Sequence, residues 1–550
     1  MKKFFLSNWQ IVLIVVLSLF IVWPLFIPGY FSHHDDLHVI RIIEMRKCFA
    51  DFQIPCRWVP DMGYGNGYPI FNFYGVFPYY LGAVASFVLG YIGATKLLFF
   101  LPLVFGGVGM YILAKELFGK IPGFVGAVLY LFAPYRALDS YVRGAVGESF
   151  ALAIIPFVFY FFLKLVKSKE RRYFVLATVS TGLFFVSHNI MTLIFTPVLL
   201  IWILFWLHKE KWKATRLAIL SFVISFGLAA FFLLPAFMEK GLVQTESLTR
   251  NELDFRAQFV RVSQLFIDRS WNYAGSAPQS ANTISYQIGW PLWWLVAMSF
   301  IAVVFRKKRK NGLLFAFLFL IFNFGAFMAH NKSSFIWENI KILSFVQFPW
   351  RFLSIVIFSG SLIGAYFISF FKGKHLYLLT ITFSLLAIIL NWQYFRPEHF
   401  YKDVTDESKL TGASFIDQQK GSLLDYLPKT ALEPRELAPT EPQVTRGEAI
   451  VSDFVNKSDS WSFRTNVSQE AIIEVPVFDF PNWTVYVNGE KYPHSNKNVI
   501  GRIMLTLSSG EYNVSGKFLN TPTRTIANTI TVVSLLSLAL IYAKGRKFFV

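Results

Sequence analysis

Twelve stretches of this chain are long, apolar and free of charge in their interiors. A helix needs about 20 apolar residues to cross a bilayer core, and each charge at its centre costs about 2.5–3.5 kcal/mol on insertion. We therefore expect a polytopic α-helical membrane protein with about 12 spans, two of which (121–135 and 173–187) are short. The expected spans cover about 10–27, 97–114, 121–135, 149–163, 173–187, 190–207, 217–237, 289–305, 311–329, 351–371, 375–392 and 525–543.

The composition agrees with a bilayer environment. Apolar residues make up 55% of the chain and charged residues 15%, whereas soluble domains carry about 25% charge. This excludes the three or four soluble domains that 550 residues would otherwise suggest at roughly 150 residues each.

The net charge of +19 is distributed unevenly along the chain. With the N-terminus placed in the cytoplasm, the cytoplasmic connections hold 23 Lys and Arg against three Glu, and the other face is close to neutral. Lys and Arg concentrate in the short cytoplasmic loops of membrane proteins. The excess therefore predicts topology in the cytoplasmic membrane, with both termini cytoplasmic, and requires no nucleic acid as a partner.

The water-soluble segments are expected on the extracytoplasmic face. We divide the chain into a membrane domain (1–392) with a long outer loop at 28–96, an extracytoplasmic, mostly β domain (393–524), and a final helix with a basic cytoplasmic tail (525–550). A thirteenth apolar run at about 78–92 is interrupted by Gly, and we expect it to lie at the membrane surface. The first apolar run is followed by no small-residue cleavage site, so we interpret it as an uncleaved helix.

The β domain is predicted from short alternating segments that begin at Trp461. An Asn488-Gly489 pair separates two of them, which is typical of a hairpin, so we expect an antiparallel sheet or small sandwich. The preceding stretch, 402–448, is polar, and its apolar residues follow no clear helix or strand periodicity.

In the first outer loop, Cys48 and Cys56 either pair or remain free thiols.

The densest polar cluster follows the first span and contains three His, two Asp and an Arg within ten residues. If this stretch is helical, His34, His38 and Arg41 lie on one stripe, with Asp35 beside it. Asp35 and Asp36 then point about 100° apart, so one faces a substrate while the other orients a His or Arg. The alternative is a solvated helix cap.

A metal site is a second interpretation of the same cluster. His34 and His38 have the spacing of the two His of a zinc-protease helix, but Asp stands where that motif has Glu, and no third ligand is evident. A membrane metallohydrolase therefore stays an alternative.

Three further polar groups are expected on the same membrane face. Asp139, Arg143 and Glu148 lie on a short loop, where Glu148 needs a partner and Arg143 is the nearest candidate. His188 lies between two apolar runs, and Arg351, at the mouth of a helix, suits a lipid phosphate. Interfacial anchoring is the alternative for these groups. The sequence contains no Walker motif, so an ATP-driven pump is unsupported.

These segments resemble a prokaryotic membrane family named after 6-pyruvoyl-tetrahydropterin synthase and similar to YfhO-like proteins. The segments that carry the likeness are Ser32–Arg41, Pro55-Cys56-Arg57-Trp58, Gly65–Tyr74, Tyr141–Glu148, Ser187-His188-Asn189, Phe348–Phe352 and, for the β domain, Phe480–Gly489. Such proteins are similar to C-type glycosyltransferases. In most members a single Asp follows the His, and Asp35 matches it, whereas Asp36 does not.

The resemblance implies transfer of a sugar from a polyprenyl-phosphate carrier to an extracytoplasmic acceptor, which is a cell-envelope glycan, a lipid or a protein. It implies Asp35 as the general base, with Asp36 and Glu148 as further catalytic candidates. The donor and its phosphate would contact residues among His34, His38, Arg41, Arg57, Arg143, His188 and Arg351. A divalent ion (Mg or Mn) held by Asp35 and Glu148 is left open, as is a transporter, flippase or accessory factor for lipid-linked glycans.

Overall fold

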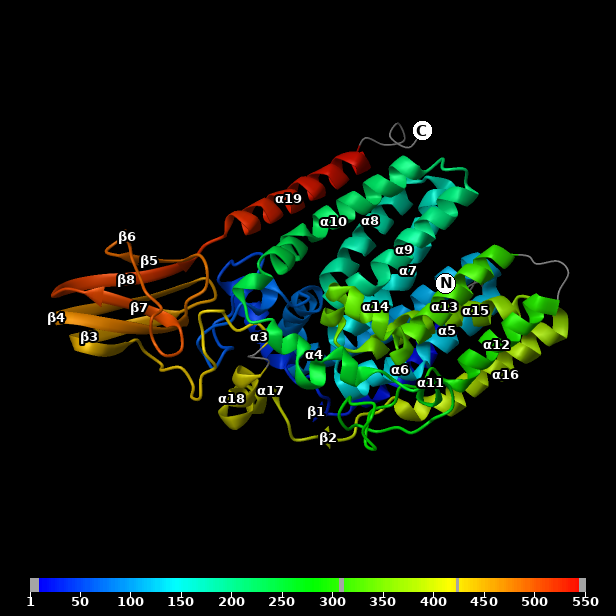
Figure 1. Ribbon diagram of the computed structural model, residues 1–550, viewed down its shortest axis with the longest axis horizontal. Coiled ribbons are helices and arrows are strands. Elements are labelled where there is room, and N and C mark those ends of the chain that lie inside the picture. Colours follow the sequence, from blue (N-terminus) through cyan, green and yellow to red (C-terminus); the bar gives the residue numbers. More distant parts are fainter. Residues whose placement is uncertain (1–8, 306–310, 422–424, 544–550) are drawn as a thin grey trace.

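The computed structural model describes residues 9–305, 311–421 and 425–543. A bundle of long helices forms one end of the molecule and a β-sheet domain forms the other (Figure 1). The predicted basic segments at Lys2 and Lys3, 306–310 and 544–547 lie outside the described residues.

Each of the twelve predicted apolar runs falls on a helix. Charge-free apolar sequence favours helix in lipid, because a helix satisfies its backbone hydrogen bonds internally. The helices that correspond to these runs are α2 (Trp9–Val22), α4 (Phe77–Phe118), α5 (Lys120–Leu131), α7 (Val146–Ser168), α8 (Arg171–Ser187), α9 (Asn189–Lys209), α10 (Thr215–Met238), α12 (Trp290–Phe305), α13 (Gly312–Met328), α15 (Leu353–Ile368), α16 (Gly373–Asn391) and α19 (Pro522–Ala543).

The predicted count of about twelve full spans is not reached in the described part of the chain. Eight helices there are long and apolar enough to cross a membrane, and α5 with the next helix makes a ninth if this bent pair is one span. The pair bends by 46° before α6 (Pro134–Ala137), where proline cannot continue the hydrogen bonding of α5. Helices α8, α12 and α13 have only 17, 16 and 17 residues. The protein is thus a multi-pass membrane protein with fewer long spans than expected.

The thirteenth apolar run forms the first part of α4 and is separated from the rest by a break at Gly90. Gly90 has φ of 68°, and a Cβ atom there would lie 2.4 Å from Asp406 Oδ2. The carboxylate of Asp406 accepts hydrogen bonds from the backbone amides of Tyr91 and Ile92, which lack helical partners after the break. Gly90 is therefore required by both conformation and space.

The first outer region is tied to the segment that follows α16. Strand β1 (Tyr30–Phe31) pairs antiparallel with β2 (Phe400–Tyr401), and α3 (His38–Ala50) follows β1. Cys48 and Cys56 form a disulfide, which decides between the two thiol states left open by the sequence. Shorter helices lie in the connecting segments: α11 (Val262–Phe266), α14 (Ser334–Asn339), α17 (Asp406–Leu410) and α18 (Gly412–Lys420).

The C-terminal domain is an antiparallel sheet, as predicted. Its strands are β3 (Gln443–Asn456), β4 (Ser460–Phe478), β5 (Trp483–Val487), β6 (Glu490–Tyr492), β7 (Arg502–Leu507) and β8 (Gly510–Phe518). The order is β3-β4-β8-β5-β6, with β7 also paired to β4. Asn488 and Gly489 both have positive φ in the predicted hairpin. Strand β3 was not expected, because this edge strand is largely exposed and lacks an apolar alternation.

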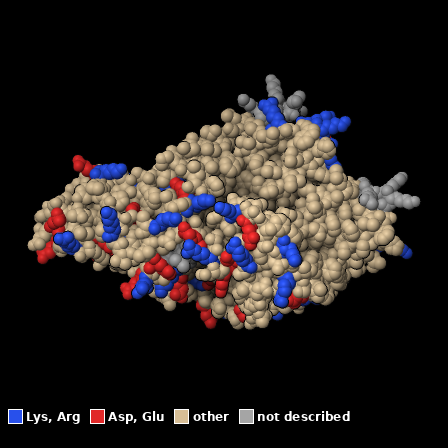
Figure 2. Space-filling view, viewed as in Figure 1, with Lys and Arg blue, Asp and Glu red and all other residues tan. Residues whose placement is uncertain are grey.

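Charge is distributed differently over the two ends. Figure 2 shows Lys, Arg, Asp and Glu gathered over the sheet domain and the outer segments, whereas the visible surface of α19 and α10 is almost uncharged. Exposed Val532, Val533, Leu535 and Leu536 on α19 agree with contact to lipid.

Candidate active site

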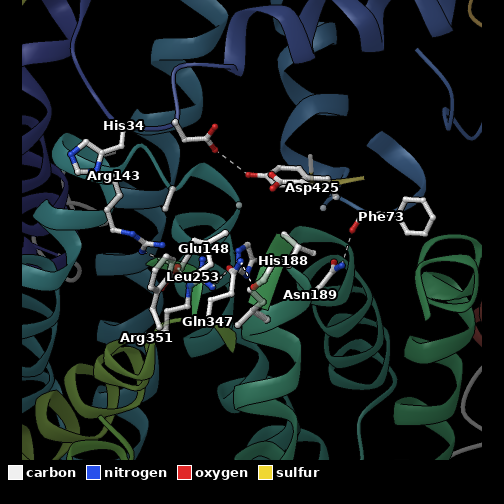
Figure 3. A pocket seen from close by; sticks show the side chains of 18 of the residues that line it. His34, Phe73, Arg143, Glu148, His188, Asn189, Leu253, Gln347, Arg351 and Asp425 are labelled. Atoms are coloured by element: carbon white, nitrogen blue, oxygen red, sulfur yellow. Dashed lines mark hydrogen bonds and ion pairs between the residues drawn. The ribbon is translucent and has the colours of Figure 1, made fainter. Parts of the chain in front are cut away.

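A polar cavity of about 330 Å³ lies where the first outer loop meets the ends of several membrane helices. Five segments that are far apart in the sequence contribute titratable side chains to it (Figure 3). These side chains are His34, Asp35, Arg41, Arg143, Glu148, His188, Arg351 and Asp425. The structure therefore brings together most of the residues that the sequence singled out.

Asp35 is held by backbone and side-chain contacts. The amides of His34 and Asp35 donate to the carbonyls of Val142 and Arg143 at 2.9 and 3.0 Å, so residues 34–35 run alongside residues 142–143. Arg41 Nη1 donates to Asp35 Oδ2 at 2.9 Å, and the hydroxyl of Tyr74 donates to the same oxygen at 3.2 Å. Burial raises the pKa of Asp35, but Arg41 and the neighbouring His outweigh it and bring the pKa to about 2. Asp35 is therefore an ionised carboxylate at neutral pH.

The expected stripe of His34, His38 and Arg41 does not form. The helix begins only at His38, and the preceding His34 and Asp35 have no helical hydrogen bonds because their amides pair with the 142–143 backbone. His34 lines the cavity and its Nε2 contacts the carbonyl of Tyr273 at 2.8 Å. His38 is buried between the hydroxyl of Tyr79 and the carbonyl of Gly144, outside the cavity wall. The two His are thus not arranged as the metal pair of the alternative interpretation.

Asp35 and Asp36 point to different partners, as expected for adjacent residues. Asp36 Oδ2 accepts a hydrogen bond from Lys409 at 2.7 Å, and its other oxygen lies 3.8 Å from His33. Asp36 is not on the cavity wall. Its contact with Lys409 joins the first outer loop to α17. Asp36, which was predicted as a catalytic candidate, therefore does not line the cavity.

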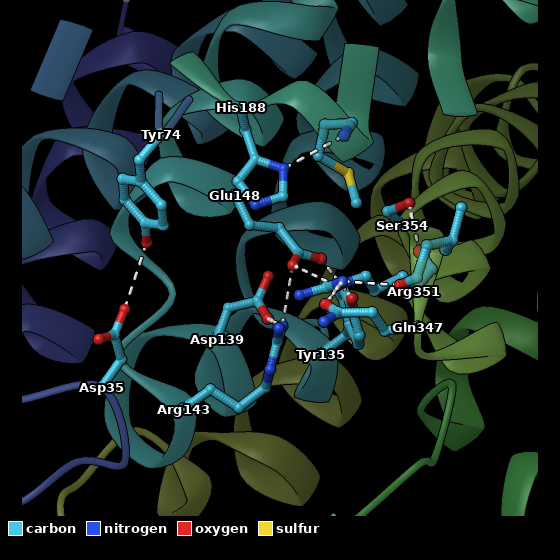
Figure 4. Close-up of polar contacts among 12 residues, drawn as sticks. Asp35, Tyr74, Tyr135, Asp139, Arg143, Glu148, His188, Gln347, Arg351 and Ser354 are labelled. Atoms are coloured by element: carbon cyan, nitrogen blue, oxygen red, sulfur yellow. Dashed lines mark hydrogen bonds and ion pairs between the residues drawn. The ribbon is translucent and has the colours of Figure 1, made fainter. Parts of the chain in front are cut away.

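Glu148 lies at the centre of a buried group of charges (Figure 4). Its Oε2 is 2.9 Å from Arg143 Nη1 and 3.5 Å from Arg351 Nε, and its Oε1 accepts from the hydroxyl of Tyr135. Arg143 also binds Asp139. The predicted pairing of Glu148 with Arg143 is confirmed, and it satisfies a carboxylate that is fully buried.

The geometry of this group depends on an unusual helical turn. Residues Leu138–Arg143 form a π-helix, labelled η3, which ends at Gly144 with φ of 69°. A Cβ atom on Gly144 would lie 2.3 Å from the ring of His33, so only glycine fits this position. π-Helical turns occur frequently at functional sites, and here the turn places Asp139 and Arg143 beside Glu148.

Arg351 and His188 complete the wall near the membrane helices. Arg351 Nη1 donates to the carbonyl of Val346 at 2.7 Å and to Gln347 Oε1 at 3.1 Å, and its guanidinium lies over the ring of Phe348. Its Nε has no hydrogen-bond partner among the described residues. Burial lowers the pKa of His188 to about 3, so its imidazole is neutral, and its Nδ1 accepts from the amide of Met191.

Arg57, which the resemblance placed among the donor-binding residues, lies outside the cavity. Its guanidinium donates to Asn72 at 3.0 Å, to the carbonyl of Phe231 at 3.0 Å and to Asn528 at 2.8 Å. These partners come from the first outer loop, α10 and α19, so Arg57 connects three elements of the fold.

Sequence reasoning missed Asp425 and Tyr426, both of which line the cavity. They lie in the polar stretch without a period, where no local pattern distinguishes a cavity residue from a solvated one. Burial raises the pKa of Asp425 to about 6 despite the nearby charge of Arg41.

The possible metal ligands already have cationic partners. Asp35 binds Arg41, and Glu148 lies beside Arg143 and Arg351. Among the described residues, no group of three or more His, Cys, Asp and Glu has the arrangement of a metal site. The donor set therefore fits a divalent ion poorly.

Residues 71–396 match the membrane-protein family described as the 6-pyruvoyl-tetrahydropterin synthase related domain, which is more than half of the chain. The chain belongs to this family. The matched range contains Arg143, Glu148, His188 and Arg351 but begins after Asp35. The family match is therefore narrower than the nearly full-length resemblance expected from the motifs.

The fold of this family member is similar to that of solved glycosyltransferase structures. The arabinofuranosyltransferase AftD from Mycobacteria is similar with a TM-score of 0.50 and 15% identity, over 75% of this chain and 29% of AftD. The oligosaccharyltransferase of Archaeoglobus fulgidus has a TM-score of 0.42 and 14% identity, over 72% of this chain and 56% of that one. The likeness to AftD shows the fold of the C-type glycosyltransferases.

A curated relative is an uncharacterized protein of Lactococcus lactis subsp. cremoris, 22% identical over 236 residues. The match covers 41% of this chain and 38% of the relative. This chain therefore spans well under half the length of both that relative and AftD.

Proposed function

We propose that this family member is a membrane glycosyltransferase that transfers a sugar from a polyprenyl-phosphate-linked donor to an extracytoplasmic acceptor. The observation that carries the proposal is one cavity with an ionised carboxylate, Asp35, and a buried guanidinium, Arg351, on its wall. The carboxylate of Asp35 can accept the proton of an acceptor hydroxyl, and the guanidinium of Arg351 can stabilise the charge of a departing phosphate.

An apolar groove beside the cavity supports a lipid-linked donor. It has a volume of about 270 Å³ and lies between α9, α10 and the segment before Arg351. Leu193, Leu233, Phe237, Ile342 and Phe345 line it, and it shares Gln347 and Tyr426 with the polar cavity. A polyprenyl chain in this groove would bring the phosphate of the donor to the polar cavity.

The proposed reaction is a single displacement. The acceptor oxygen attacks the anomeric carbon while the bond from that carbon to the phosphate oxygen breaks. Asp35 accepts the hydroxyl proton, and Arg351, with Arg143 nearby, stabilises the negative charge on the released lipid phosphate. Attack from the face opposite the phosphate inverts the anomeric configuration. Glu148 keeps the two guanidinium groups in place.

Mass spectrometry of cell-envelope glycans, with and without the gene, tests this function. We expect a sugar to disappear in the deletion strain and to return with the wild-type gene but not with Asp35→Asn. Identical glycans in the deletion and wild-type strains, under conditions in which the protein is expressed, would contradict transferase activity. Full complementation by Asp35→Asn would remove Asp35 as the base.

A further inference from the structure

A second, open groove adjoins the polar cavity. It has a volume of about 810 Å³ and is lined by Gln244, Glu246, Arg250, Asn251, Glu252 and Asp425. Leu253 and Asp425 line both this groove and the polar cavity. Asp425 therefore lies at the junction of the two spaces.

The segment that follows Asp425 is fixed by contacts with other parts of the chain. The carbonyl of Leu427 accepts from the amide of Gln244 at 2.8 Å, and the amide of Lys429 donates to the carbonyl of Leu242 at 2.9 Å. The ring of Tyr426 stacks on Phe73 with centroids 5.6 Å apart. These contacts hold the Asp425 backbone against the wall of the cavity.

Tyr426 is also held through its backbone. Its amide donates to the hydroxyl of Tyr68 at 2.8 Å, and the Tyr68 side chain is fully buried. The segment thus uses buried aromatic rings and backbone hydrogen bonds to bring one carboxylate from the outer polar stretch to the cavity.

The carboxylate of Asp425 differs from the others in its surroundings. Within the described residues this carboxylate has no salt-bridge or hydrogen-bond partner, whereas Asp35 and Glu148 are bound to guanidinium groups. Figure 3 shows Asp425 and His34 on one side of the cavity, with Arg351 and Gln347 on the other. Asp425 is therefore available to a ligand opposite the proposed phosphate position.

The chemistry of the open groove favours a carbohydrate. Its polar side chains are amides, carboxylates, the hydroxyl of Ser247 and one guanidinium. Together they can donate hydrogen bonds to hydroxyl groups and accept hydrogen bonds from them. Among the described residues, Leu253 is the one apolar side chain on its wall, so this lining offers little to a lipid tail or to the side chains of an apolar peptide.

We propose that this groove binds a polyhydroxyl glycan acceptor and that Asp425 accepts a hydrogen bond from the hydroxyl-bearing end that enters the cavity. This inference rests on the proposed transferase function and adds the acceptor class and its binding residue. Asp425 holds the acceptor on the side of the cavity that faces Asp35, while the donor phosphate lies near Arg351.

The first test compares Asp425→Asn with Asp453→Asn, a matched change at an exposed Asp of the β domain. Two measurements are made for each variant: the sugar product in complemented deletion cells, and binding of undecaprenyl phosphate to the purified full-length protein by native mass spectrometry. We expect Asp425→Asn to lower the product about ten- to a hundredfold, as expected for loss of a hydrogen bond to a charged group, with unchanged lipid binding. Asp453→Asn leaves both unchanged.

The outcomes separate the inference from the function on which it rests. Normal product with Asp425→Asn overturns the role of Asp425. Loss of both product and undecaprenyl phosphate binding also overturns it, because the change then acts on the whole site. If the wild-type protein neither binds this lipid nor alters any glycan, the proposed function itself fails.

The second test identifies the occupant of the groove. A photo-crosslinking residue replaces Arg250 in living cells, and the same residue replaces Ile342 in the apolar groove as the control position. We expect the adduct at position 250 to contain carbohydrate and the adduct at position 342 to contain lipid. An adduct at position 250 that contains only peptide or only lipid overturns the glycan assignment.

Discussion

Arg41 on α3 binds the carboxylate of Asp35 at 2.9 Å while its guanidinium lies 4.4 Å from the ring centre of Tyr74, whose hydroxyl donates to the same carboxylate oxygen. One Asp, one Arg and one Tyr therefore form a closed set of contacts on the cavity wall. This set holds Asp35 ionised and fixes its direction.

The first prediction concerns the pH dependence of transfer. Asp35 has a pKa of about 2, so its ionised form, and the stability gained from Arg41, are present above the ordinary pKa of about 4 and are lost as the pH falls toward 2. Arg41→Gln removes the cation while burial remains, so the pKa of Asp35 rises and the acid limb of activity moves upward. Transfer by membranes, measured from pH 4 to 8, checks this. An unchanged acid limb in Arg41→Gln would show that Asp35 ionisation does not control the rate.

The second prediction separates the base from its neighbour. Asp35→Asn keeps the size of the side chain but removes its ability to accept a proton, so we expect transfer to fall about 10²- to 10⁴-fold. Asp36→Asn is the matched change at the adjacent residue, which binds Lys409 away from the cavity. We expect it to reduce activity by less than Asp35→Asn. The reverse order, at equal expression, would assign the base to Asp36.

The third prediction concerns the buried charge group around Glu148. Glu148→Ala leaves Arg143 and Arg351 without this carboxylate, and breaking such buried pairs costs about 3–5 kcal/mol. Thermal unfolding in detergent should show a lower Tm. Glu170→Ala, at a half-exposed residue in the connection before α8, is the control and should leave the Tm unchanged. Equal Tm values for the two variants would contradict a structural role of Glu148.

The fourth prediction concerns the lipid phosphate. Arg351→Gln removes the positive charge from the cavity wall, and Arg351→Lys keeps the charge but not the planar group. We expect binding of undecaprenyl phosphate to decrease in the order wild type, Lys variant, Gln variant. Lipid binding that is the same for all three proteins would place the phosphate elsewhere.

The fifth prediction concerns the disulfide of the first outer loop. Cys48 and Cys56 are separated by eight positions, and closing a loop of that size stabilises a fold by about 2–3 kcal/mol in the chain-entropy description. The double change to Ser should lower the Tm, and a reducing agent should lower the Tm of the wild type but not of the double variant. A reductant effect on both proteins would have another cause.

Several features were determined by the sequence alone because they depend on local composition. Charge-free apolar runs predicted the helices, and the alternation after Trp461 with the Asn488-Gly489 turn predicted the antiparallel sheet. The pairing of Glu148 with Arg143 was also predictable, since a buried carboxylate needs a nearby cation and Arg143 lies five residues away.

Only the tertiary structure decided which polar residues share the cavity. His38 and Asp36 are in the same short cluster as Asp35 but face Tyr79 and Lys409, because the helix begins only at His38 and the backbone before it pairs with residues 142–143. Asp425 joins Asp35 from nearly 400 residues away through contacts of Tyr426 and Leu427 with other segments. Local sequence carries the preference for helix, strand and burial, whereas the meeting of distant side chains depends on packing between elements, which no local pattern contains.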